Sequence, residues 1–113
     1  MPWITPEGQQ VELPQEIHHC NIDEPLQPSL LMHKQALLLP FTSAAEGRPF
    51  SWCSRLRRLG YSGPIVAAGE LGLDRLAYAF RCGFSLAWLS DAEVGQLGPI
   101  HLRPFSHYYQ GTT

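Results

Sequence analysis

The sequence of 113 residues predicts an α/β fold, with a small, mostly parallel sheet of three to four strands and helices on its faces. Between residues 35 and 89, short continuous apolar runs alternate with amphipathic helical segments, and such runs are typical of strands buried on both sides. Glycines stand where the helical periodicity stops, the usual place for a left-handed C-cap. Short connections between such units favour right-handed crossovers and parallel strands. We therefore expect half of a (β/α) barrel or a flavodoxin-like domain.

Two parts are expected in the chain: an N-terminal arm, residues 1–34, and an α/β domain, residues 35–113. Prolines break any long helix in the arm, at Pro2, Pro6, Pro14, Pro25 and Pro28. Short extended pieces on either side of Glu7 and Gly8 predict a small hairpin or a loosely packed arm. Trp3 and Ile4 are costly to leave in water, so we expect the arm to dock on the rest of the molecule.

The α/β domain should contain closely spaced elements. We expect strands over 36–41, 64–68 and 84–89, and helices over 49–59 and 71–82. The run from Ser90 to Glu93 is a capping box and predicts a short third helix. A final extended segment is one option for residues 101–110. The apolar faces of the two longer helices should be formed by Trp52, Leu56 and Leu59, and by Leu73, Leu76, Ala77 and Phe80.

Composition narrows the expected partners and location. Charged residues make up only 16% of the chain, below the roughly 25% of an average domain, so a partner or a second copy should cover part of the surface, and a homodimer is one option. The net charge of −2 does not favour nucleic acid. We expect no membrane association, because no apolar run is long enough to span a bilayer. Three cysteines without a CxxC pair suggest reduced thiols and a cytoplasmic protein.

The arm contains His18, His19 and Cys20, followed by Asp23, which are all metal-ligand types. Adjacent ligands on a loop need a second pair elsewhere to close a tetrahedral site, and no other histidine has motif spacing. The alternative is a polar loop with one buried cysteine, so we assign no metal to the chain. No nucleotide-binding glycine motif occurs either, and we expect no cofactor.

Three residues should gather at the carboxyl edge of the sheet, where ligands of open parallel α/β sheets usually bind. Arg48 lies in the loop after the first strand, and Gly69 and Glu70 follow the second. Arg48 and free backbone N–H groups could hold an oxyanion such as sulfite, sulfate or phosphate there. The alternative is that Arg48 braces the loops in an ion pair with Glu46 or Glu70.

Asp74, Tyr78 and Arg81 form a polar stripe on the second helix. Asp74 and Arg81 are two turns apart, about 10 Å along the axis, so they cannot pair directly. The stripe is therefore either a solvated face or a contact surface for a partner.

The stretch GRPFSWCSRLRRLGYSGPIVAAGELGLDRLAYAFRCGF resembles a bacterial family of unknown function, the DUF934 family. The similarity includes Gly47-Arg48, Gly60-Tyr61, Gly69 and the run from Arg81 to Phe84, and it extends over roughly the last two-thirds of the chain. The chain departs from the family pattern at Ser85, where an acid is usual, and around residues 69–75.

The resemblance implies an accessory role in bacterial assimilatory sulfite reduction, because members of the family are usually encoded beside the haem-containing sulfite reductase. On this basis we expect a protein that acts through protein–protein contact, with sulfite reductase as its partner. The alternative is a small oxyanion-binding enzyme or oxidoreductase component that uses the carboxyl edge of the sheet.

Overall fold

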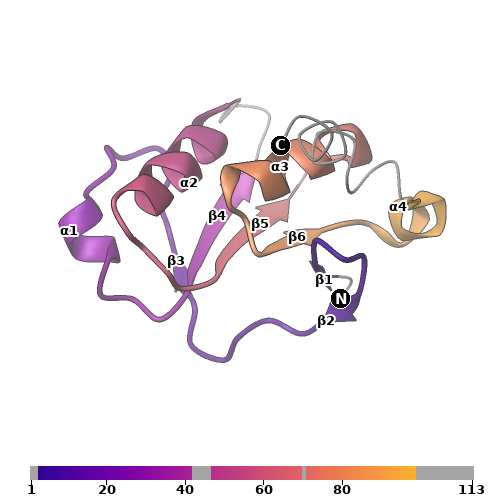
Figure 1. Cartoon of the computed structure of the whole chain (residues 1–113), viewed down its shortest axis with the longest axis horizontal. Coiled ribbons are helices and arrows are strands. Elements are labelled where there is room, and N and C mark those ends of the chain that lie inside the picture. The colour runs from indigo at the N-terminus through magenta and orange to yellow at the C-terminus, as the bar shows by residue number, and fades with distance from the viewer. Residues whose placement is uncertain (1–2, 42–46, 70, 99–113) are drawn as a thin grey trace, which may run out of the picture.

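A computed structural model describes residues 3–41, 47–69 and 71–98, which form a six-stranded mixed sheet with helices packed against it (Figure 1). The strand order is β2-β1-β6-β5-β4-β3. The strands are β1 Trp3–Ile4, β2 Gln10–Val11, β3 His18–His19, β4 Leu37–Phe41, β5 Ile65–Gly69 and β6 Leu86–Trp88. The helices are α1 Pro28–Leu31, α2 Arg48–Arg58, the 3-10 turn η1 Leu73–Arg75, α3 Leu76–Cys82 and α4 Asp91–Gln96.

Strands β3, β4, β5 and β6 are mutually parallel, as the short connections predict. The two centre strands β4 and β5 are paired along their whole length, from Leu37 opposite Ile65 to Phe41 opposite Gly69. Both strands therefore end at the same level, and their carboxyl ends share one edge of the sheet.

The predicted sheet of three to four strands was too small. The segment before residue 35 supplies β3 at one edge and the hairpin of β1 and β2 at the other, where β1 pairs antiparallel with β6. The hairpin predicted around Glu7 and Gly8 is present, and Trp3 and Ile4 are buried. Strand β3 gave no apolar signal, because its two residues are histidines on an edge with a single neighbour. The division of the chain at residue 35 stays a prediction.

Helices α1, α2 and α3 cover one face of the sheet. Their buried side chains, among them Leu31, Leu56 and Leu76, join one core with the side chains of β4 and β5 that point to this face. The opposite face has a smaller apolar cluster, made by Trp3, Leu38, Val66 and Leu86. None of the helices in the described ranges is long and apolar enough to cross a membrane.

Helix α2 lies within one residue of its predicted position. Trp52, Cys53 and Leu56 are buried against the sheet, whereas Leu59, expected on the same face, is 51% exposed. The helix ends at Arg58, so Leu59 is already past the last turn that packs on the sheet. Gly60 follows with φ +100°, the left-handed conformation predicted for it.

The second predicted helix begins later than expected. Gly69 and Gly72 both have positive φ, and Leu71 between them is buried. The chain therefore passes through the 3-10 turn η1 before α3 begins at Leu76. The helix ends at Gly83 in the left-handed conformation, and the capping box at the start of α4 is formed, both as predicted. The segment expected at 101–110 lies outside the described residues.

One arginine joins the two loops that precede β5 and β6. Arg57 donates hydrogen bonds to the carbonyl oxygens of Tyr61 (2.9 Å), Gly63 (2.7 Å) and Gly83 (3.0 and 2.8 Å), and to Oγ of Ser85 (3.1 Å). Its alkyl stem lies where a Cβ on Gly83 would be, 2.6 Å from Cγ. Arg57 thereby ties the end of α2 to the end of α3.

Candidate functional site

Arg48 begins α2 at the carboxyl edge of the sheet. Its Nη1 donates a 2.9 Å hydrogen bond to the carbonyl oxygen of Ile22, in the segment between β3 and α1, and the side chain is otherwise exposed. Proline at the next position suits the first turn of a helix, which explains why α2 starts here. Arg48 therefore holds the leading segment against α2. The Glu46 and Glu70 carboxylates proposed as ion-pair partners lie outside the described residues.

Gly69 has a packing reason for being glycine. It has φ +99°, and a Cβ there would collide with the carbonyl oxygen of Phe41 on the paired strand. The backbone N–H of Leu71 also bonds to the Gly69 carbonyl oxygen at 2.9 Å. The close approach of β5 to β4 thus accounts for the glycine without any ligand.

Arg75 lies beside an aromatic cluster that the sequence did not reveal. Phe50, in the first turn of α2, contacts the rings of Phe41 (5.0 Å between centroids), Phe84 (6.4 Å) and Tyr78 (4.8 Å). The guanidinium carbon of Arg75 lies 5.6 Å from the Phe50 centroid and 5.9 Å from that of Phe41. Its Nε donates to the Leu71 carbonyl oxygen at 3.0 Å. The signal that could have found Arg75 is its place shortly after β5, the same criterion that selected Glu70.

The predicted stripe is divided between two elements. Asp74 lies in η1, whereas Tyr78 and Arg81 lie in α3, and all three are exposed. The Asp74 carboxylate bends back over the turn, because one of its oxygens is 2.9 Å from where a Cβ on Gly72 would be. Tyr78 and Arg81 are three residues apart and share one side of α3.

Tyr78 combines a fixed ring with an exposed edge. The ring meets Phe50 in a T-shaped contact, yet 45% of the residue is open to solvent. The neighbouring Cys82 side chain, one turn along the helix, raises the pKa of Tyr78 above its ordinary value through its electrostatic interaction and hydrogen bond with the hydroxyl. Phe50 is common to the predicted anion site and the predicted partner-binding stripe. It belongs to the same helical turn as Arg48, and its ring supports Tyr78.

The three cysteines are free thiols. Burial raises the pKa of Cys20 to about 11 and that of Cys53 to about 12. Since the thiolate is the reactive form, both thiols are unreactive at neutral pH.

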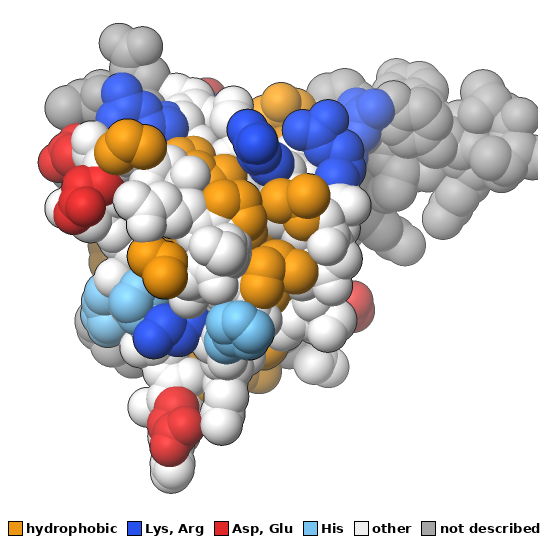
Figure 2. Space-filling view, turned by 90° about the vertical axis from the view of Figure 1, so that its left-hand side faces the viewer, with side chains coloured by type: hydrophobic (Ala, Val, Ile, Leu, Met, Phe, Trp, Pro, Cys, Tyr) orange, Lys and Arg blue, Asp and Glu red, His pale blue; other side chains and the backbone are white. Residues whose placement is uncertain are grey.

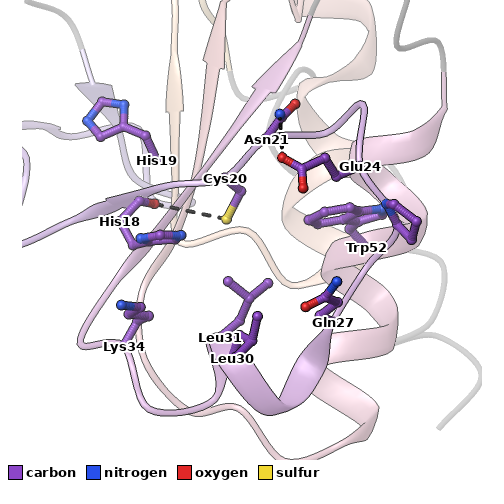
Figure 3. Close-up of a pocket in the computed structure, with 11 residues that line it drawn as sticks. His18, His19, Cys20, Asn21, Glu24, Gln27, Leu30, Leu31, Lys34 and Trp52 are labelled. Atoms are coloured by element: carbon purple, nitrogen blue, oxygen red, sulfur yellow. Dashed lines mark hydrogen bonds between the residues drawn. The ribbon is translucent and has the colours of Figure 1, made fainter.

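The histidine-cysteine cluster is split by the strand that carries it. Side chains alternate along β3, so His18 and Cys20 share one side while His19 is turned away (Figure 3). In residues 3–41, 47–69 and 71–98, no three histidine, cysteine, aspartate or glutamate side chains are grouped so that they could hold a metal ion. Cys20 is buried, as the alternative interpretation expected, whereas His18 and His19 lie in strand β3 and not in a loop.

Comparison with known families gives one match. The family model described as "Bacterial protein of unknown function (DUF934)" matches residues 21–113, which is most of the chain. No curated protein and no solved structure matches the chain.

Proposed function

We propose that this chain, which belongs to the DUF934 family, is an accessory protein of assimilatory sulfite reduction. It acts by protein–protein contact in the cytoplasm, and its partner is sulfite reductase. The support for a role in this pathway is the family resemblance described above, because members of the family are usually encoded beside that enzyme.

The observation that carries the contact hypothesis is the exposed, anchored ring of Tyr78. Tyrosine and arginine are enriched at the energetic centres of interfaces, because they offer large contact areas together with hydrogen-bond donors. Tyr78 is held against Phe50, so little side-chain freedom remains to be lost on binding. Arg81 on the same side of α3 adds a planar cation that can pair with a carboxylate of the partner.

The experiment measures the affinity of the full chain for sulfite reductase by biolayer interferometry. Arg81→Glu and Tyr78→Ala should each weaken binding by about tenfold or more, as expected when a central interface side chain is lost. Leu59→Ser on α2 is the matched control, because Leu59 is also a large exposed side chain but lies away from the stripe. Circular dichroism checks that Tyr78→Ala is folded. Equal affinities of all four proteins would refute the role of the stripe.

The second candidate is an oxyanion-binding enzyme or oxidoreductase component that uses the carboxyl edge. It is favoured by Arg48 and Arg75, which follow β4 and β5 and thus bring two guanidinium groups to the region beyond that edge. Isothermal titration with sulfite, sulfate and phosphate tests this candidate. Binding that Arg48→Ala abolishes would support it, whereas no heat from the parent chain at millimolar sulfite would reject it.

A further inference from the structure

A groove between β3, α1 and α2 is not used by the proposed function. It has a volume of about 430 Å³, which lies within the range of small-molecule sites. The residues that line it include His18, Cys20, Leu30, Leu31, Lys34 and Trp52. Figure 2 shows this face of the molecule, where histidine and basic side chains lie next to one another below a group of hydrophobic side chains.

The floor of the groove is apolar. Cys20, Leu31 and Trp52 are each almost fully buried; Cys20 directly follows β3, Leu31 ends α1 and Trp52 lies in α2. Leu30 stands at the rim with 60% of its surface exposed, although leucine is among the residues that gain most from burial. The groove therefore offers apolar surface that a bound organic group would cover.

One end of the groove has the positively charged ammonium group of Lys34. His18 and Lys34 lie together on one side, and Trp52 lies on the other (Figure 3). Their main chains are fixed, because the His18 N–H bonds to the Ala36 carbonyl oxygen at 2.9 Å and the Tyr61 hydroxyl donates to the Lys34 carbonyl oxygen at 2.9 Å. The two side chains therefore project from backbone positions that are held by hydrogen bonds.

Glu24 is the acid among the described residues that line the groove, and its carboxylate is hydrogen-bonded. Oε1 of Glu24 accepts a 2.8 Å bond from Nδ2 of Asn21, and Figure 3 shows this pair at the end away from Lys34. Glu24 keeps its negative charge but lies at the far end of the groove, so the charged group beside His18 is the ammonium of Lys34.

We propose that this groove binds a small organic anion, in which a carboxylate or sulfonate group is held by Lys34 and His18. A flat apolar body attached to that group packs on Leu31 and Trp52. An inorganic oxyanion would leave the apolar floor uncovered, so the groove fits an organic acid better than sulfite. The Cys20 thiol serves as a neutral part of the floor, because burial raises its pKa to about 11 and it is protonated at neutral pH. His18 and Cys20 precede the residues that match the family, so the groove depends on the leading segment of this chain.

The test follows naphthoate binding to the full chain by NMR, through the indole N–H signal of Trp52, which a Trp52→Phe variant identifies. Naphthoate should shift this signal saturably. Three other ligands should each bind at least about threefold more weakly. They are naphthamide, the neutral isostere; acetate, which lacks the aromatic body; and sulfite. Equal affinity of naphthoate and any of the three, or shifts confined to Trp3 and Trp88, would overturn the proposal.

Two variants separate the charge from the apolar contact. Lys34→Met keeps the length of the stem but removes the cation, and should weaken naphthoate binding about threefold while leaving naphthamide unchanged, as expected for an exposed ion pair. Leu30→Ala at the rim should weaken both ligands by about threefold. Arg58→Met is the matched control, because Arg58 is an exposed base on α2 outside the groove, and it should change neither. A Lys34→Met protein that binds naphthoate as the parent does would refute the anion contact.

Discussion

Arg57 gives the most specific prediction about stability. Replacing it by alanine removes the five hydrogen bonds that join the loops before β5 and β6, and with them the contact to Ser85 and to three carbonyl oxygens. It also removes the guanidinium group that lies 5.8 Å from the Tyr61 ring centroid. The three carbonyl oxygens would then have to be hydrated or lose this donor, whereas Ser85 Oγ still accepts from the Ile65 N–H at 3.4 Å.

The size of the effect follows from these contacts. A hydrogen bond to a charged group contributes about 1.5–3 kcal/mol. Arg57 is only half-buried, so water reaches part of the loops and we count somewhat less than 1 kcal/mol for each of the four acceptors. The free energy of unfolding should therefore fall by about 3 kcal/mol. For a domain of this size that lowers Tm by about 12 °C.

Urea unfolding followed by circular dichroism measures the change directly. The matched control is Arg58→Ala, because Arg58 is the adjacent arginine, is exposed, and makes no side-chain hydrogen bond within the described ranges. It should change stability by less than about 0.5 kcal/mol. Arg57→Lys keeps the charge but cannot reach both loops, so the stability that it loses should lie between the losses for Arg57→Ala and Arg58→Ala. Losses of the same size for Arg57→Ala and Arg58→Ala would refute the reasoning.

Three further predictions concern single positions. Gly69→Ala should lower the free energy of unfolding by at least about 2 kcal/mol more than Gly60→Ala. Both glycines have φ near +100°, but of the two only Gly69 has a carbonyl oxygen where the Cβ would go. Equal losses, measured by denaturation, would contradict this. The free energy of unfolding should fall above pH 9, because an unfolded cysteine loses its proton there while folded Cys53, with a pKa of about 12, keeps it. In Cys53→Ala this fall should be shallower between pH 9 and 11. An unchanged slope of the free energy against pH would contradict the burial of the thiol. Ser90→Ala breaks the capping box of α4 and should lower stability by about 1 kcal/mol in the same assay, whereas no loss would mean that α4 adds nothing to global stability.

The parts of the fold that the sequence predicted are those with local causes. Strands β4 and β5 appear as apolar runs because both of their faces are covered. The left-handed Gly83 and the capping box at Ser90 depend only on neighbouring residues, so their signals are complete within a few positions. Such features can be recognised without knowing how the elements pack.

The parts that escaped prediction depend on tertiary packing. The two histidines of β3 form a strand only because β4 offers them a free edge. Leu59 fits the apolar stripe of α2 but lies beyond the last turn, and Arg57 fits no apolar pattern although it joins two loops. Among the candidate site residues, Tyr78 was selected as polar, whereas its support by Phe50 required the packing of α3 on α2.

The central claim is that α3 forms a contact surface for sulfite reductase, and hydrogen exchange of the complex tests it most directly. Amide exchange is measured on the full chain alone and with excess sulfite reductase. Binding should slow exchange in η1 and α3, residues 73–82, and leave the edge strands β2 and β3 unchanged. Identical exchange with and without the enzyme, or protection confined to segments other than residues 73–82, would contradict the account.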